Sequence, residues 1–268
     1  MKKHVIALLL AVNSLYFFGC AEVPIIGRKQ FNVVPDSTLN QMADEQYQQF
    51  LSENKLSSDS SAAAMVRRVG SNIQKATEEY FRMKGEAGFL NSFDWKFNLV
   101  ENEQVNAWAM PGGKVVVYTG LLELADTEEK LAVVVAHEIA HAVAKHGAER
   151  MSYQLASQLG GVALSVAIKD YSGQTQAIFE QAYGMTSQYA LVLPYSRKHE
   201  YEADRMGMIF MALAGYDPRV AETFWQEMSA RSQGPEVYEW MSTHPSDESR
   251  VQAIRRQMPE AMQYYKRG

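Results

Sequence analysis

Two histidines and a glutamate stand at the spacing of a metal site, in the segment His137-Glu138-Ile139-Ala140-His141. On a helix, His137 and His141 are one turn apart and share a face, so that both imidazoles can bind a single Zn²⁺. Glu138 is rotated by about 100° from His137, and it can accept a proton from water at the site without being a ligand. The H-E-x-x-H pattern therefore predicts the two ligands and the general base of a zinc peptidase.

The flanking sequence predicts a buried helix. Asp126 or Thr127 can cap its start, and neither Gly nor Pro interrupts residues 128–146 before Gly147. The segment is apolar almost all round, which is typical of a helix inside the core. A plain core helix with two satisfied histidines is the alternative. Because burying two histidines and a glutamate without partners is costly, we favour the metal.

A second pair of acidic residues could complete the site. Glu200 and Asp204 are one helical turn apart in residues 196–211, whereas Glu202 points elsewhere. A catalytic zinc takes three protein ligands, and a carboxylate behind them commonly accepts the second N–H of a ligand histidine. Glu200 is thus a candidate third ligand, with Asp204 behind His137 or His141. A solvated acidic face is the alternative, since such pairs are common.

The composition is that of a globular protein. The chain has 268 residues, of which 47% are hydrophobic, and a formal net charge of -5. Neither a repeat nor a basic patch suggests a nucleic-acid partner. We predict a single domain over residues 36–268, with an α+β fold that is mostly helical. The oligomeric state is left open.

Residues 1–20 have the features of a signal peptide. Lys2 and Lys3 precede an apolar stretch that is too short to span a bilayer, and Gly19-Cys20 follows it. Cys20 is the only cysteine, which suggests a lipoprotein acylated there; a stray thiol is the alternative. The residue after Cys20 is Ala21 rather than Asp, as in bacterial lipoproteins that are sorted to the outer membrane, so the resemblance implies that location. Residues 21–35 are predicted to be a tether.

Three short strands are predicted just before the metal helix. Residues 95–100, 104–110 and 114–118 have strand character, and Pro111-Gly112-Gly113 marks a turn. They predict a small antiparallel sheet. A peptidase commonly aligns its substrate by strand addition to a sheet edge. The candidate edge, as against a plain hairpin, comprises Asn106, Ala107, Trp108, Ala109 and Met110.

Taken together, these motifs resemble the HtpX/BepA/LoiP-type zinc metallopeptidases, relatives of the CAAX prenyl proteases and the Oma proteases. The resemblance covers residues 95–258 and implies one Zn²⁺ per chain, bound by His137, His141 and Glu200, with Glu138 as base and Asp204 behind the ligands. It rests on Asn106 to Gly113, Thr119 to Leu122, His137 to His146, Ser196-Arg197, Glu200 to Asp204, Thr243-His244-Pro245 and Arg250.

The resemblance also implies a role for His244 close to the metal. This histidine could stabilise the oxyanion, or it could occupy the fourth zinc position and keep the enzyme dormant. His146 lies on a different helical face from His141, and His199 faces away from Glu200, so neither is expected to be a ligand. The absence of a predicted membrane span after residue 20 makes the chain most similar to the small lipoprotein members.

The sequence thus predicts a zinc-dependent endopeptidase of the bacterial cell envelope. We expect it in the periplasm, anchored to the outer membrane, where it would degrade damaged or misassembled proteins. Polypeptides would be its substrates. The alternatives are a non-catalytic chaperone or assembly factor and a dormant protease plugged by His244. Glu138 argues against the chaperone, because a scaffold needs no base at that position.

Overall fold

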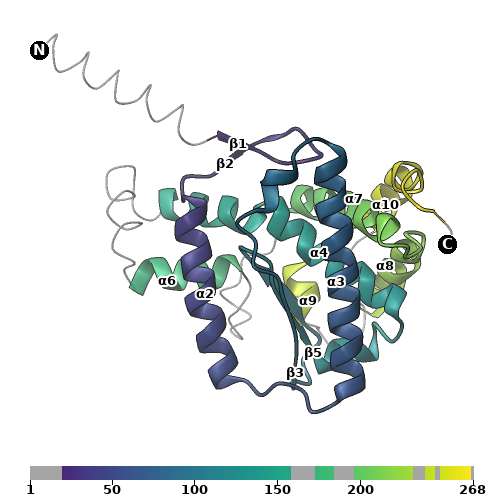
Figure 1. Cartoon of the computed structure of the whole chain (residues 1–268), viewed down its shortest axis with the longest axis horizontal. Helices are drawn as coiled ribbons and strands as arrows, with labels where there is room; N and C mark the ends of the chain where they lie inside the picture. The colour runs from purple at the N-terminus through teal and green to yellow at the C-terminus, as the bar shows by residue number, and fades with distance from the viewer. Residues whose placement is uncertain (1–19, 158–172, 184–195, 232–238, 245–247, 267–268) are drawn as a thin grey trace, which may run out of the picture.

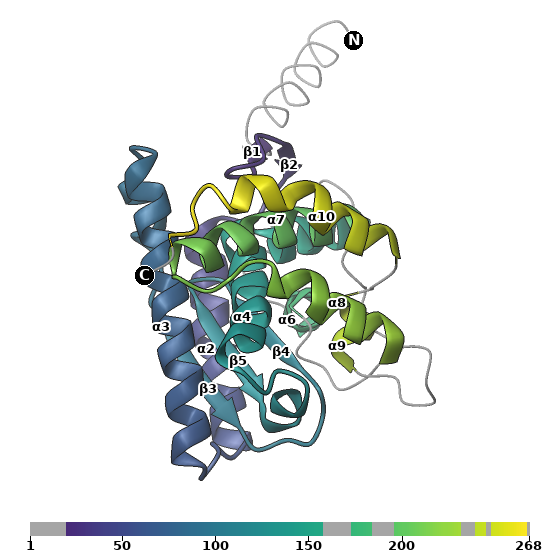
Figure 2. The same ribbon diagram turned by 90° about the vertical axis from the view of Figure 1, so that its right-hand side faces the viewer.

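The computed structural model describes residues 20–157, 173–183, 196–231, 239–244 and 248–266. The sheet and the central helix α4 lie between a pair of helices on one side and a helical layer on the other (Figures 1 and 2). The α+β prediction is confirmed. The helices are α2 (Asp36–Glu53), α3 (Ser60–Met83), α4 (Glu128–Val143), α6 (Gly173–Ala182), α7 (Arg197–Leu213), α8 (Val220–Arg231), α9 (Glu239–Thr243) and α10 (Glu248–Ala261), with 3₁₀ turns at Ala87–Leu90 and Thr119–Glu123.

The main sheet has three strands in the order β3-β5-β4. Strands β4 (Ala107–Met110) and β5 (Lys114–Tyr118) form the predicted antiparallel hairpin, with Ala107 opposite Val117. Gly112 and Gly113 make its turn at φ values of 73° and 84°, where a side chain would be strained. Strand β3 (Lys96–Val100) runs parallel to β5, so the sheet is mixed. Strand β4 forms an edge of this sheet, as expected.

Helix α4 lies at the centre of the fold. Every residue from Leu131 to Val143 is buried, and Thr127 caps the helix by accepting the N–H of Lys130. Helix α7 crosses α4 at Gly207, where an added Cβ would lie 3.2 Å from the backbone of Ala136 and His137. This close approach brings the acidic residues of α7 next to the two histidines of α4. The apolar sequence of the segment thus explains its central position.

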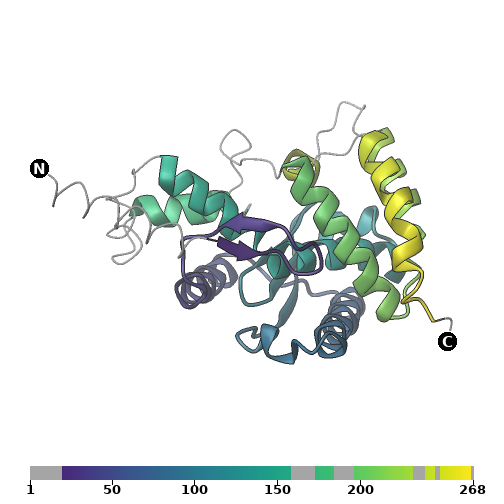
Figure 3. The same cartoon turned by 90° about the horizontal axis from the view of Figure 1, so that it is seen from above.

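The segment that we expected to be a tether packs against the domain. Strands β1 (Cys20–Glu22) and β2 (Lys29–Phe31) form an antiparallel hairpin that lies across one end of the molecule (Figure 3). Val23, between the strands, is fully buried in the main core. The segment is held to the domain by this apolar contact of Val23 and by hydrogen bonds from Arg28 to Glu202 of α7. Residues 1–19, with most of the predicted signal peptide, lie outside the described part of the chain.

None of the helices in the described ranges is both long and apolar enough to cross a membrane.

Candidate metal centre

Four potential metal ligands converge where helices α4 and α7 and the end of α9 meet. The Nε2 atoms of His137 and His141 are 3.0 Å apart, and Glu200 Oε2 and Oε1 lie 3.4 Å from the first and second of them. His244 Nδ1 lies 3.2 Å from His137 Nε2 and 3.2 Å from Glu200 Oε1. One donor atom of each residue falls within 4.8 Å of all the others, and all four side chains are buried. Three imidazoles and a carboxylate in this arrangement fit Zn²⁺.

Three separate elements supply these donors. Helix α4 carries His137 and His141 on one face, and the first turn of α7 carries Glu200. Ser196 caps α7 by accepting the N–H of His199, which fixes where that first turn begins. His244 follows α9, and its backbone N–H donates to Trp240 O at 2.9 Å. The predicted residues are therefore brought together by packing between elements that are far apart in the sequence.

Asp204 lies behind His137, which is one of the two histidines that it was predicted to contact. Its Oδ1 is 2.9 Å from His137 Nδ1, which leaves Nε2 of that ring facing the cluster. Arg250 of α10 donates to both Asp204 oxygens at 2.8 Å and lies 2.7 Å from Glu200 Oε2. Its guanidinium stacks 3.3 Å above the Trp225 ring. One fully buried cation thus holds two carboxylates of the site.

These contacts set the charges of the cluster. Burial alone would raise the pKa of Glu200, but the nearby charges of His244 and Arg250 outweigh it and hold that pKa well below its usual value. Burial and the neighbouring His137 lower the pKa of His141. For His137, burial is outweighed by Asp204 and Glu200, which raise its pKa to about 9. A metal at this cluster would need the His137 imidazole in its neutral form, because only a neutral ring nitrogen can be a ligand.

Glu138 stands beside the cluster and outside it. The Trp240 indole N–H donates to Glu138 Oε1 at 2.8 Å, and His244 Nε2 lies 3.4 Å from the same oxygen. Glu138 shares a cavity with the edge strand β4. The residues that line this cavity are Asn106, Ala107, Trp108, Ala109, Glu138, Arg150, Tyr183, Thr243 and His244. A carboxylate and a sheet edge at one cavity are the groups that hydrolysis of an extended peptide would need.

Comparison with known proteins places this site in a family. Residues 69–258 match the family model for Peptidase family M48. The chain belongs to peptidase family M48. The resemblance predicted from the motifs is thereby confirmed, and so is the identification as a metallopeptidase.

Individual M48 relatives come from mitochondria and bacteria. The chain is 34% identical over 258 residues to mitochondrial metalloendopeptidase OMA1 of Schizosaccharomyces pombe, which covers 94% of this chain and 71% of that protein. It is 29% identical to the human mitochondrial metalloendopeptidase OMA1, over 92% of this chain and 48% of that protein. It is 27% identical to the beta-barrel assembly-enhancing protease of Escherichia coli, over 94% and 51%. It thus spans about half the length of the latter two.

A second group of polar residues lies behind the metal ligands of this M48 site. Helix α4 ends at Val143, and Lys145 adopts a φ of 55°, so the chain turns before the next helical segment. The turn brings His146 Nδ1 to 3.0 Å from His141 Nδ1. His146 is not among the four clustered donors, but it contacts one of them, His141. We had expected the helix to continue to Gly147, which hid this contact.

The group continues through two carboxylates. His146 Nε2 lies 3.0 Å from Glu202 Oε2, and His199 Nε2 lies 2.9 Å from Glu149 Oε2. Burial would raise the pKa of Glu202 and of Glu149, but hydrogen bonds from His146, His199 and Arg28 lower both to about 2. Both side chains are therefore anionic at neutral pH. Sequence spacing had indicated only that Glu202 and His199 point away from the ligands.

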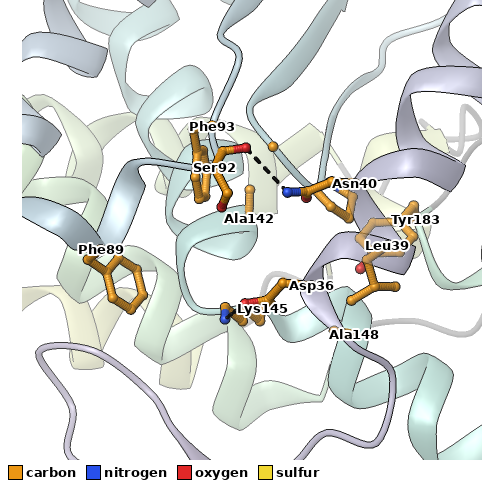
Figure 4. A pocket seen from close by; sticks show the side chains of 12 residues that line it. Asp36, Leu39, Asn40, Phe89, Ser92, Phe93, Ala142, Lys145, Ala148 and Tyr183 are labelled. Atoms are coloured by element: carbon orange, nitrogen blue, oxygen red, sulfur yellow. Dashed lines mark hydrogen bonds and ion pairs between the residues drawn. The ribbon is translucent and has the colours of Figure 1, made fainter.

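Another cavity lies next to the turn between β4 and β5, and Pro111 and Gly112 of that turn belong to its lining (Figure 4). Its rim carries the ion pair between Lys145 and Asp36, at 2.6 Å, and the hydrogen bond from Asn40 Nδ2 to Ser92 O, at 3.2 Å. Tyr183 lines this cavity and also the one that holds Glu138. The two cavities therefore share Tyr183 in their lining, and Lys145 and Asp36 in the second cavity pair with each other.

Proposed function

We propose that this M48 protein is a zinc-dependent endopeptidase. The observation that carries the proposal is that the four-donor cluster, Glu138 and the edge strand β4 meet at one buried cavity. His137, His141 and Glu200 would hold the metal, and Asp204 would orient the ring of His137. Zn²⁺, when bound, supplies a Lewis acid that polarises the scissile carbonyl and acidifies water.

The protein's own groups then carry out the proton transfers. Glu138 takes a proton from the attacking water and later delivers it to the leaving amine. In this structure the Glu138 carboxylate accepts the Trp240 indole N–H, 2.8 Å away. Backbone groups of Asn106 and of β4 as far as Ala109 would bind the substrate as an added strand, which explains how different sequences could be accepted.

Metal dependence tests this proposal directly. We expect the mature chain to cleave an unfolded protein such as casein, to lose the cleavage in a zinc chelator and to regain it when Zn²⁺ is restored. Peptide products resolved by mass spectrometry would show internal cuts, as an endopeptidase requires. Cleavage that persists in the stripped protein would contradict a metal-dependent reaction.

We also propose that the protein works in a bacterial cell envelope, as an outer-membrane lipoprotein acylated at Cys20. The lipoprotein-like sequence around Cys20 supports this, and so does the similarity to an Escherichia coli protease named for β-barrel assembly. Its substrates would be damaged or misassembled envelope proteins. Mass spectrometry of the mature N-terminus should find diacylglyceryl and acyl groups on Cys20, and an unmodified Cys20 would contradict the anchor.

The position of His244 favours a second proposal about the same site. A zinc site closed by four protein ligands is typical of structural rather than catalytic zinc. His244 completes such a set, while Trp240, in the short helix α9 that directly precedes His244, donates to Glu138. We therefore propose that the structure represents a dormant form of the enzyme, which opens when His244 is displaced.

A further inference from the structure

Arg28 connects the N-terminal hairpin to two buried carboxylates. Its Nε and Nη2 donate to Glu202 at 2.8 and 3.0 Å, and its Nη1 and Nη2 donate to Glu149 at 2.8 and 2.7 Å. The side-chain exposures are 14% for Arg28, 5% for Glu149 and 7% for Glu202. A guanidinium that makes paired hydrogen bonds to two carboxylates at this depth fixes both of them.

Glu202 leads from Arg28 to the metal centre. Glu202 Oε2 can only accept a hydrogen bond, so the Nε2 of His146, 3.0 Å away, carries the proton. In a neutral ring, His146 Nδ1 must then accept, and its partner at 3.0 Å is the Nδ1–H of His141. His141 is thereby held as the tautomer whose Nε2 is unprotonated and can bind a metal, and that Nε2 faces the cluster.

Glu149 anchors the other side of the same arrangement. It accepts a hydrogen bond from His199 Nε2 at 2.9 Å, and the ring of His199 stacks on that of His146, with centroids 4.4 Å apart and planes at 19°. Without Arg28, Glu149 and Glu202 would be two buried anions that lack their shared cation. Repulsion between the two carboxylates would then push Glu202 away from His146. The position of His146 therefore depends on a residue of the hairpin.

We propose that Arg28 is a positioning residue for the metal centre and that the N-terminal hairpin, through it, is part of the active site. A series of contacts between four side chains connects the hairpin to the metal centre, in the order Arg28, Glu202, His146 and His141. Metal-ligating histidines usually donate their second N–H to a partner that fixes the ring, and loss of that partner typically lowers metal affinity about 10–100-fold. The inference rests on the proposed zinc site.

Metal affinity tests this role without reference to peptidase activity. In the full chain, Arg28→Gln should raise the Zn²⁺ dissociation constant about tenfold, measured by competition with a chromophoric chelator. It should also change the visible absorption of the Co²⁺-substituted protein, which reports on the ligand geometry. Arg28→Lys should recover part of the affinity, since lysine restores the charge but lacks the paired hydrogen-bond geometry.

The matched control is Arg205→Gln. Arg205 lies in α7, as does Glu202, and makes a paired, half-buried contact with Glu260 at 2.7 and 2.9 Å, but that contact leads to no metal ligand. The Arg205→Gln variant should leave the Zn²⁺ dissociation constant and the Co²⁺ spectrum unchanged. A comparable loss of affinity in both variants would mean that a general loosening of the fold, rather than the path through His146, is responsible, and would overturn the inference.

The remaining outcomes separate this inference from the proposed function. Wild-type and Arg28→Gln proteins with the same affinity and spectrum would overturn the role of Arg28 and leave the zinc site intact, whereas a wild type that binds no Zn²⁺ would overturn both. If circular dichroism shows that Arg28→Gln does not fold, Glu202→Gln replaces it, because the amide keeps the shape and accepts more weakly from His146. Lower affinity in Glu202→Gln supports the path, and unchanged affinity overturns it.

Discussion

Replacing Glu138 with glutamine should lower peptidase turnover by about 10²–10⁴-fold, the usual contribution of a general acid–base, while Zn²⁺ remains bound. Glutamine has nearly the same shape, and its carbonyl oxygen can still accept the Trp240 N–H that now reaches Glu138 at 2.8 Å. It cannot take a proton from water. Because Glu138 is not one of the four clustered donors, the metal should be unaffected. Cleavage rates and bound zinc, measured on the same samples, test both halves.

The matched control for this variant is Glu129→Gln. Glu129 lies in the first turn of the same helix and is exposed, so its replacement should leave the cleavage rate unchanged. Wild-type turnover in Glu138→Gln would contradict the proposed base. The non-catalytic chaperone makes a different prediction: wild type and variant would both bind an unfolded client, and neither would cut it, although both contained zinc.

The predicted part of the metal centre consists of residues related by local spacing. His137 with His141, and Glu200 with Asp204, are each one helical turn apart, and a helix fixes such pairs in space before any tertiary contact is known. The β4–β5 hairpin was predictable for the same reason, because Gly112 and Gly113 mark its turn. The parallel pairing of β3 with β5 was not, since it depends on a non-local contact.

Residues that depend on long-range packing were not predictable from spacing. Arg250 belongs to a motif that matches the family, but its pairing with Asp204 joins α10 to α7. No spacing in the sequence connects Trp240 with Glu138, although its N–H donates to that carboxylate in the fold. Arg28 was predicted to lie in a tether because Pro24, Gly27 and Pro35 occur in that segment. A single arginine in a short segment gives no signal of the buried anions that it will contact, since Glu149 and Glu202 are more than a hundred residues away.

The second large effect is expected from His244→Ala, which should raise the cleavage rate about tenfold, a change equivalent to about 1.4 kcal/mol. In the dormant form, only the fraction of molecules with His244 displaced can react, so the apparent rate is reduced by that fraction. Alanine removes the competing imidazole, which now lies 3.2 Å from His137 Nε2. His137, His141 and Glu200 remain to hold the metal, so bound zinc should stay at one per chain.

The sign of this effect decides between the two roles considered for His244. If the imidazole stabilises the oxyanion instead, its removal should slow cleavage by about 10²–10³-fold, as the loss of one such donor usually does. The structure favours a rise. His244 Nδ1 is directed at the ligand cluster, and the backbone N–H of Trp240 donates to Val105 O at 3.1 Å, beside the start of β4. The element that carries both residues therefore lies against the approach to the substrate-binding edge, and the same movement that frees the fourth ligand position would release Glu138 from Trp240.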